Sequence, residues 1–133
     1  YEEMLNEYAN KYVNIHWHGQ IPYKEYLNLL HSVTFLLSTR DPEMPENQCN
    51  FPSKIIESLL HNRIIISTIE YKQIDNIKYF KATSQQEFFK QHIDGIAHMS
   101  EKSLMEYANQ GKKVAEMFST KVWNETMEMI ESK

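Results

Sequence analysis

Two short apolar runs constrain the fold of this chain more than any other feature of its sequence. Val33 to Leu37 and Ile64 to Ser67 each have the length of a strand and are largely apolar on both faces, which is typical of strands buried inside a parallel sheet. An amphipathic helix is predicted before each run, over Pro22 to His31 and over Pro52 to His61. This alternation predicts an α/β fold with a parallel sheet flanked by helices.

The remaining elements follow from the same periodicities. One helix is predicted over Tyr1 to Lys11, and another begins at a capping box at Ser84 to Glu87 and extends to Ala97. A third is predicted from the apolar stripe Leu104, Ala108, Gly111, Ala115 and Phe118. Ser119 is expected to cap the last helix. Strands are predicted over Asn14 to His18 and Ile77 to Lys81, with a loop over Ser38 to Phe51 that is long enough to indicate function. Asn62 is expected to end its helix in the left-handed conformation. The sequence has no internal repeat, so residues 1–133 are predicted to form one domain.

Composition excludes several classes of protein. The net charge of −4, with no basic stripe, argues against a nucleic-acid partner. The chain has three glycines, Gly19, Gly95 and Gly111, and their spacing excludes both a glycine-rich dinucleotide fingerprint and a Walker phosphate loop. The lone cysteine, Cys49, fits a reducing compartment, and no apolar run approaches the ~20 residues of a membrane span. A cytoplasmic domain is expected, free or peripheral at the inner face of the membrane.

Three segments together resemble one enzyme family. Asn14 to Pro22 resembles the strand and turn N-V-x-F-x-G-x-V of retaining glycosyltransferases with the GT-B fold. Asn50 to Glu57 looks like the helix start F-P-S-K-(I/L)-x-E of capsule and polysaccharide glycosyltransferases, and Ser58 to Thr68 is similar to their A-x-x-x-G-K-P-V-V-(A/S)-T. The order and spacing agree with the family over essentially the whole chain. The resemblance implies the Rossmann-like C-terminal half of a GT-B fold, which binds the donor nucleotide, without its first strands.

The resemblance also implies a site and a reaction. Glu57 would bind the ribose hydroxyls, Ser53 and Lys54 would meet the diphosphate at the start of their helix, and Gln20 and Ile21 would border the base. Asn50 and Phe51, directly before that helix, belong to the same expected nucleotide-sugar site. The intact enzyme would move a sugar from a nucleoside diphosphate sugar to a saccharide or lipid-linked acceptor in cell-envelope polysaccharide synthesis. No metal and no other cofactor is implied, and no catalytic residue is assigned.

The chemistry of these residues is compatible with that site. Ser53, Lys54 and Glu57 share one face of the predicted helix, whereas residues 55, 56, 59 and 60 share the opposite face, which is expected to be buried. A helix N-terminus favours an anion, because its first amides have no partner within the helix and its dipole is positive there. A carboxylate one turn further in can accept two hydrogen bonds from a vicinal diol.

The sequence departs from the family in ways that affect activity. Many relatives carry a second glutamate eight residues before the ribose glutamate, and Cys49 stands there in this chain. The family's basic pair and its acceptor domain lie upstream of the residues given, so transfer by this chain alone is not expected. Two strands of the resembled sheet are also missing. We therefore expect either self-association through the exposed edge of strand 33–37 or direct pairing of strand 14–18 with it.

Plainer interpretations of the same residues stay open. Glu57 can be a solvated helix acid, Lys54 a solubilising lysine and Ser53 a helix cap. His16 and His18 lack a third metal ligand at a recognisable spacing, and Cys49 shows no sign of activation. The alternative functions are a non-catalytic, flavodoxin-like interaction module and a sugar-nucleotide epimerase of the same fold.

Overall fold

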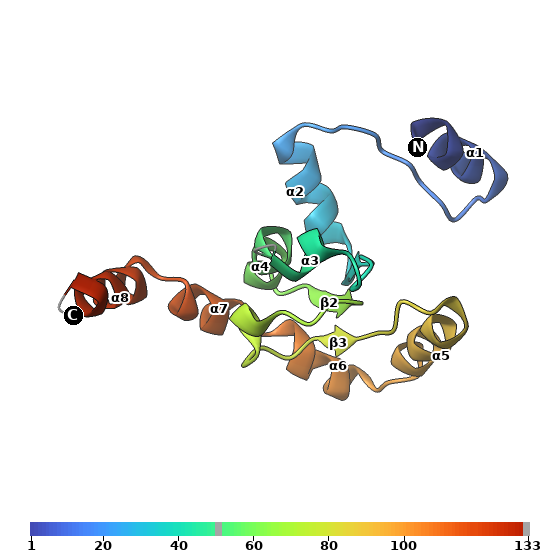
Figure 1. Ribbon diagram of the computed structural model, residues 1–133. Coiled ribbons are helices and arrows are strands. Elements are labelled where there is room, and N and C mark those ends of the chain that lie inside the picture. The colour runs from blue at the N-terminus through green and yellow to red at the C-terminus, as the bar shows by residue number, and fades with distance from the viewer. Residues whose placement is uncertain (50–51, 132–133) are drawn as a thin grey trace. The chain divides into compact units, whose positions relative to one another are not determined.

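The computed structural model describes residues 1–49 and 52–131 and divides the chain into two compact units, Tyr1–Ser32 and Val33–Lys133 (Figure 1). The second unit holds a three-stranded parallel sheet with flanking helices. The predicted α/β class is confirmed at this level. None of the described helices is both long enough and apolar enough to cross a bilayer.

The first unit consists of two helices and the segment that joins them. Helix α1 covers Glu2–Lys11 and helix α2 covers Tyr23–Ser32, both close to the predicted bounds. Pro22 directly precedes α2, and its carbonyl accepts the amide of Tyr26 at 3.0 Å, as expected for a proline at a helix start.

The predicted strand at Asn14 to His18 is wrong. The chain turns as it leaves α1, where the amide of Ile15 bonds the carbonyl of Tyr12 at 3.0 Å, and residues 14–18 are exposed without strand structure. A strand needs a neighbour for its backbone groups, and no described strand pairs with this segment. The predicted pairing of 14–18 with 33–37 is therefore also wrong, whereas self-association stays a prediction.

The second unit is built on the sheet order β1-β2-β3. Strand β1 is Phe35–Ser38, β2 is Ile64–Ser67 and β3 is Phe80–Lys81, and both pairings are parallel. Every residue of the central strand β2 is buried, which is why its sequence is apolar on both faces. Only the end of the predicted strand 77–81 pairs as β3. Because the strands are parallel, their carboxyl ends lie along one edge of the sheet.

Helices and one 3₁₀ turn connect these strands and follow them. They are α3 Pro45–Cys49, α4 Ser53–Leu60, η1 Lys72–Ile74, α5 Gln86–Ala97, α6 Glu101–Ala108, α7 Gly111–Met117 and α8 Thr120–Glu131. The loop predicted over Ser38 to Phe51 thus includes one short helix. The Ser119 hydroxyl accepts the amide of Val122 at 3.4 Å, so the predicted cap of the last helix is confirmed.

Two helix predictions need correction. The stripe from Leu104 to Phe118 forms two helices, because Gln110 lies between them and bonds the backbone of Lys78 with its side chain. The capping box at Ser84 does not form, since Gln85 is the N-cap of α5 and makes no side-chain cap bond. The amide of Gln85 instead donates to the Thr83 hydroxyl at 3.2 Å.

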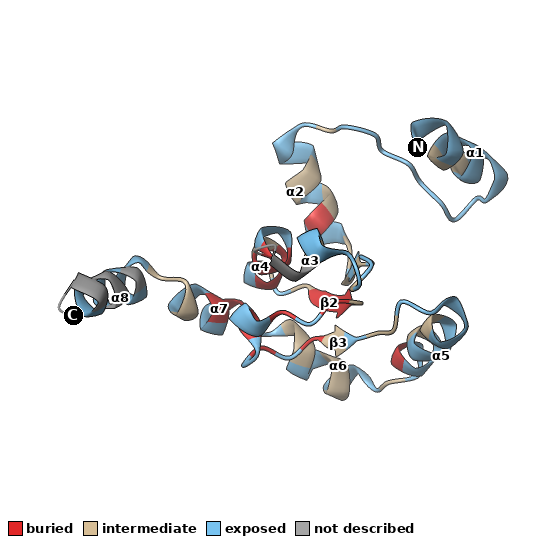
Figure 2. Cartoon of the chain, in the orientation of Figure 1, coloured by how far each residue is buried: buried red, intermediate tan, exposed pale blue. Residues whose placement is uncertain are grey.

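The core of this unit lies between β2, α4, η1 and α7 (Figure 2). The buried arc of α4 runs from Ser58 through Ile55 and Leu59 to Ile56, and at about 100° per residue Leu60 falls beyond its rim. Leu60 is 43% exposed, which corrects the prediction that it packs inward.

The turn after α4 is as predicted. Asn62 has a φ of 58°, so the left-handed helix end is confirmed. Its side-chain oxygen accepts the amide of Gly111 at 2.9 Å, which joins the end of α4 to the start of α7. Gly111 has no side chain, which lets the two helices approach closely at that point.

Candidate functional site

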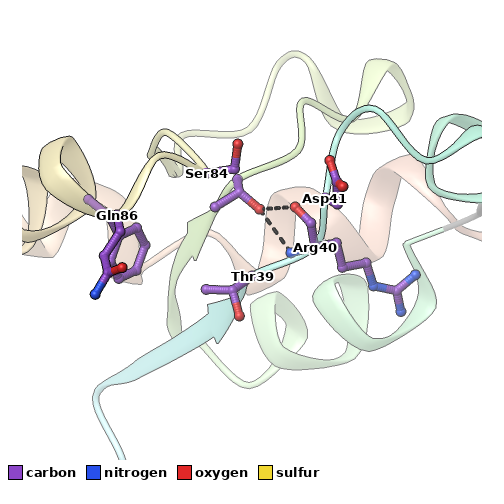
Figure 3. Close-up of a pocket in the computed structure, with 7 residues that line it drawn as sticks. Thr39, Arg40, Asp41, Ser84 and Gln86 are labelled. Carbon is purple, nitrogen blue, oxygen red and sulfur yellow. Dashed lines mark hydrogen bonds between the residues drawn. The ribbon is translucent and has the colours of Figure 1, made fainter.

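The carboxyl edge of the sheet carries two polar loops that are tied to each other. The loop after β1 begins at Thr39, and Thr68 directly follows β2. The Thr68 hydroxyl accepts the amide of Arg40 at 2.9 Å and donates to the carbonyl of the same residue (Figure 3). The amide of Thr68 also bonds the carbonyl of Ser38 at 3.1 Å. These bonds fix the backbone of Arg40 at the edge where ligands of open α/β sheets bind.

A small cleft lies between the end of β1 and the start of α4. Its volume is about 40 Å³, and it is lined by Ser38, Arg40, Pro52, Ser53, Lys54, Ile55 and Tyr71. This is slightly more than the ~30 Å³ that one water molecule occupies in the liquid. The cleft therefore has room for about one water-sized group, and a phosphoryl group or a larger ligand would extend outside it.

The start of α4 gives this cleft a positive potential. The first intrahelical bond runs from the amide of Ile56 to the carbonyl of Pro52 at 2.9 Å, and Pro52 provides no side-chain cap. The amino end of a helix carries a partial positive charge. Two cationic side chains, those of Arg40 and Lys54, line the cleft as well. This combination favours an anionic ligand.

Tyr71 forms part of the cleft wall from the interior. It is 5% exposed, and its amide donates a hydrogen bond to the Tyr79 hydroxyl at 2.9 Å. The Tyr71 hydroxyl lies 3.5 Å from the Ser38 hydroxyl. The wall beside Ser38 therefore carries two neighbouring hydroxyl groups.

Two of the predicted site residues line this cleft and another does not. Ser53 and Lys54 lie in the first turn of α4 and border it. Glu57 lies one turn further along α4 and is half-buried, but it is not among the described residues that line the cleft. Its expected contact with a ribose stays a prediction.

The remaining predicted residues lie elsewhere in the chain. Gln20 is exposed and Ile21 half-buried, and both belong to the first unit, in the segment before α2. Asn50 and Phe51 lie outside the described residues. The prediction that these four residues share one site with α4 stays a prediction.

Arg40 is a site residue that the sequence pattern does not predict. The expected cation of the diphosphate site is Lys54, and Arg40 stands in a loop without periodicity. A basic residue two positions after a parallel strand is the signal that predicts it, because such a position falls at the carboxyl edge of the sheet. Thr68, which holds the Arg40 backbone, is the first residue after β2.

A second and larger cleft opens at the same edge. Its volume is about 500 Å³, and it is lined by Thr39, Arg40, Asp41, Thr68, Ser84, Gln86 and Phe89 (Figure 3). Its residues come from the loops after all three strands and from the start of α5. Arg40 borders both clefts.

Metal ligands do not gather at either cleft. Over residues 1–49 and 52–131, no group of three His, Cys, Asp or Glu side chains is placed to hold a metal ion. His16 and His18 lie in the exposed segment that does not form the predicted strand.

Comparison with known proteins adds no relative: no family model, no curated protein and no solved structure matches this chain.

Proposed function

We propose that this chain is the donor-binding part of a retaining GT-B glycosyltransferase that uses a nucleoside diphosphate sugar in polysaccharide synthesis. One observation carries the proposal: Arg40, Lys54 and the amino end of α4 meet in a small cleft at the carboxyl edge of a parallel sheet. Cations and a helix start at such an edge suit the diphosphate of a nucleotide.

The two cations would act differently on a diphosphate. The guanidinium of Arg40 can donate two parallel hydrogen bonds to phosphoryl oxygens, whereas the Lys54 ammonium acts as a point charge. A lysine in the first helical turn is repelled by the positive end of the helix dipole. An anion bound between the lysine ammonium and the helix start would be attracted by both and would offset this repulsion. Glu57, one turn along α4, would accept hydrogen bonds from the ribose diol.

The same groups would assist the transfer step in the complete enzyme. The bond from the sugar's anomeric carbon to the diphosphate oxygen breaks, and negative charge builds up on the leaving diphosphate. The anomeric carbon forms a new bond to the acceptor's hydroxyl oxygen, and the leaving diphosphate takes up the proton of that hydroxyl. Positioned cations and a helix start stabilise that charge. Orientation of the acceptor requires further protein, so this chain alone should bind the donor without turning it over.

Binding is tested by NMR titration of the isotope-labelled chain with uridine, guanosine and adenosine diphosphates. We expect a dissociation constant near millimolar, about −4 kcal/mol, with shifts at residues 53–57 and at Arg40. Arg40→Ala, Lys54→Ala and Glu57→Ala should each weaken binding by about tenfold or more, because each removes a charge-assisted contact. Lys102→Ala, an exposed lysine on α6 that lines neither cleft, is the control.

The titration can contradict the proposal. Chemical-shift changes confined to regions away from residues 19–22, 39–40 and 52–57 would contradict the proposed binding site. Turnover is tested separately, by incubating the chain with nucleoside diphosphate sugars in metal-free buffer. Sugar release above the rate without protein would contradict the expectation that this chain is inactive alone.

A further inference from the structure

Strand β1 is an edge of the sheet, and some of its backbone groups have no partner. The carbonyls of Thr34 and Ser38 accept amides from the β2 side at 3.0 and 3.1 Å, so the even-numbered residues of this segment turn their backbone groups toward β2. Backbone groups of successive residues in a strand point to opposite sides. The amides and carbonyls of Phe35 and Leu37 therefore point away from β2, and within the described part of the chain nothing bonds them.

This edge lacks the features that usually prevent a strand from pairing further. Edge strands are commonly blocked by charged side chains, by proline or by a bulge. Strand β1 has the sequence Phe-Leu-Leu-Ser, and its register with β2 is unbroken over all four residues. The side chain of Leu37 is 55% exposed. Unpaired backbone groups beside an exposed apolar side chain favour the addition of another strand.

We propose that β1 pairs antiparallel with β1 of a second copy of this chain, about a two-fold axis at Leu36. In this arrangement Phe35 of each copy lies opposite Leu37 of the other. The outward amides and carbonyls of these two residues then form four hydrogen bonds between the copies. The two three-stranded sheets become one sheet of six strands, and Phe35 of one copy packs beside the exposed Leu37 of the other.

The symmetry of the edge favours a second copy as the partner. The two residues with outward backbone groups lie on either side of Leu36, so the same segment rotated by 180° places a donor opposite each acceptor. No residue of β1 is charged, so pairing of two copies brings no like charges together along the strand. The edge is therefore complementary to itself.

The pairing determines where the clefts of the two copies lie. Both clefts are at the carboxyl ends of the strands, whereas the pairing uses the side of β1. Because the second copy of β1 runs in the opposite direction, the clefts of the two copies lie at opposite ends of the joined sheet. The inference goes beyond the proposed function and does not rest on nucleotide binding at α4.

Sedimentation equilibrium over a range of protein concentrations tests the association, and we expect the parent chain to dimerise. Leu37→Lys places an ammonium group opposite Phe35 of the other copy, and it should weaken dimerisation by about tenfold or more because that group loses water on pairing. Leu60→Lys is the matched control, since Leu60 is 43% exposed and belongs to α4. Far-UV circular dichroism checks that both variants fold.

Cysteine variants in a Cys49→Ser background test the register. At the two-fold axis Leu36 lies opposite Leu36 of the other copy, with about 4.5 Å between the Cα atoms, a separation that a disulfide spans. The two Leu37 positions are diagonal neighbours about 7–8 Å apart, which is beyond the usual reach of a disulfide. Under mild oxidation Leu36→Cys should therefore form a covalent dimer, and Leu37→Cys should form far less.

A third combination covers the loss of a core contact, because Leu36 packs against the core. If Leu36→Cys does not fold, a mixture of Phe35→Cys and Leu37→Cys chains tests the same register. Their cysteines lie directly opposite each other, so the mixture should cross-link more than either variant alone.

Three results would overturn the proposal. They are a parent chain that stays monomeric, a dimer that Leu37→Lys weakens no more than Leu60→Lys does, and cross-linking of Leu37→Cys alone as readily as the designed pairs. Nucleotide titration at residues 53–57 reports separately on the proposed function. A monomer that binds nucleotide contradicts the pairing alone, and a dimer that binds no nucleotide contradicts the donor site alone.

Discussion

Two glycines in helices should respond to the same substitution with opposite sign. Gly111 is the first residue of α7, and an added Cβ would stand 2.6 Å from the carbonyl oxygen of Leu60 and 2.9 Å from the side-chain oxygen of Asn62. Gly95 lies inside α5, and a Cβ there would meet nothing within 4 Å. A side chain at position 111 would therefore collide with the backbone of α4, whereas a side chain at position 95 has free space.

The expected magnitudes follow from these distances. At Gly111 the carbonyl of Leu60 belongs to the end of α4, so relief requires the two helices to separate, which costs about 1–3 kcal/mol. The shift would also weaken the bond from the Gly111 amide to Asn62, worth about 1 kcal/mol. Gly111→Ala should therefore lower the free energy of unfolding by about 2–4 kcal/mol. Gly95→Ala should raise it by up to about 1 kcal/mol, because alanine is the better helix former.

Urea unfolding followed by far-UV circular dichroism measures both effects. The slope with urea should stay constant across the three proteins, so that the midpoints report stability alone. A Gly111→Ala midpoint equal to that of the parent chain, or a shift of both variants in the same direction, would refute the argument from close approach.

The remaining predictions use the same unfolding measurement. Gln110→Leu should cost about 1–3 kcal/mol, because the buried Gln110 side chain bonds both the amide and the carbonyl of Lys78 and leucine leaves them unpaired; equal midpoints would contradict this. Asn62→Ala should be less stable than Asn62→Gly by about 1 kcal/mol, because both variants lose the same hydrogen bond but only alanine is strained at a φ of 58°. The reverse order of stability would show that the left-handed turn is not needed. The hydrogen bond between Lys78 and Glu106 raises the pKa of Lys78 and lowers the pKa of Glu106 from their ordinary values. Glu106→Gln should therefore lower the free energy of unfolding at neutral pH. The difference from the parent chain should fade as the pH falls through the lowered pKa of Glu106 or rises through the raised pKa of Lys78, and it should shrink in salt. A difference in stability that persists in acid would contradict this prediction.

The parts of the fold that could be predicted from sequence are those set by short-range patterns. The apolar run of β2 has one favourable environment, and the stripe of α4 followed by Asn62 predicts both a helix and its end. Residues 14–18 show the opposite case. Their sequence fits a strand, but strand structure depends on a neighbouring backbone that no local pattern supplies.

Long-range contacts account for most of what the sequence did not predict. The break between α6 and α7 depends on Gln110 reaching Lys78, 32 positions away, and an uninterrupted helical stripe gives no sign of it. The candidate site divides in the same way. A helix start at Ser53 and Lys54 is visible in the sequence, whereas Arg40 reaches the same cleft through a bond to Thr68 that only the folded sheet creates.

The position of Arg40 has a consequence for how the two clefts act together. The residue borders both clefts, its backbone is fixed by Thr68, and its guanidinium lies 3.5 Å from the side-chain amide oxygen of Asn47. One guanidinium cannot serve two ligands fully at once. Separate ligands that both recruit it would therefore oppose each other's binding, and thermodynamic reciprocity makes the two effects equal in size. A single molecule that spans both clefts would instead gain from having one cation at the junction of its two halves.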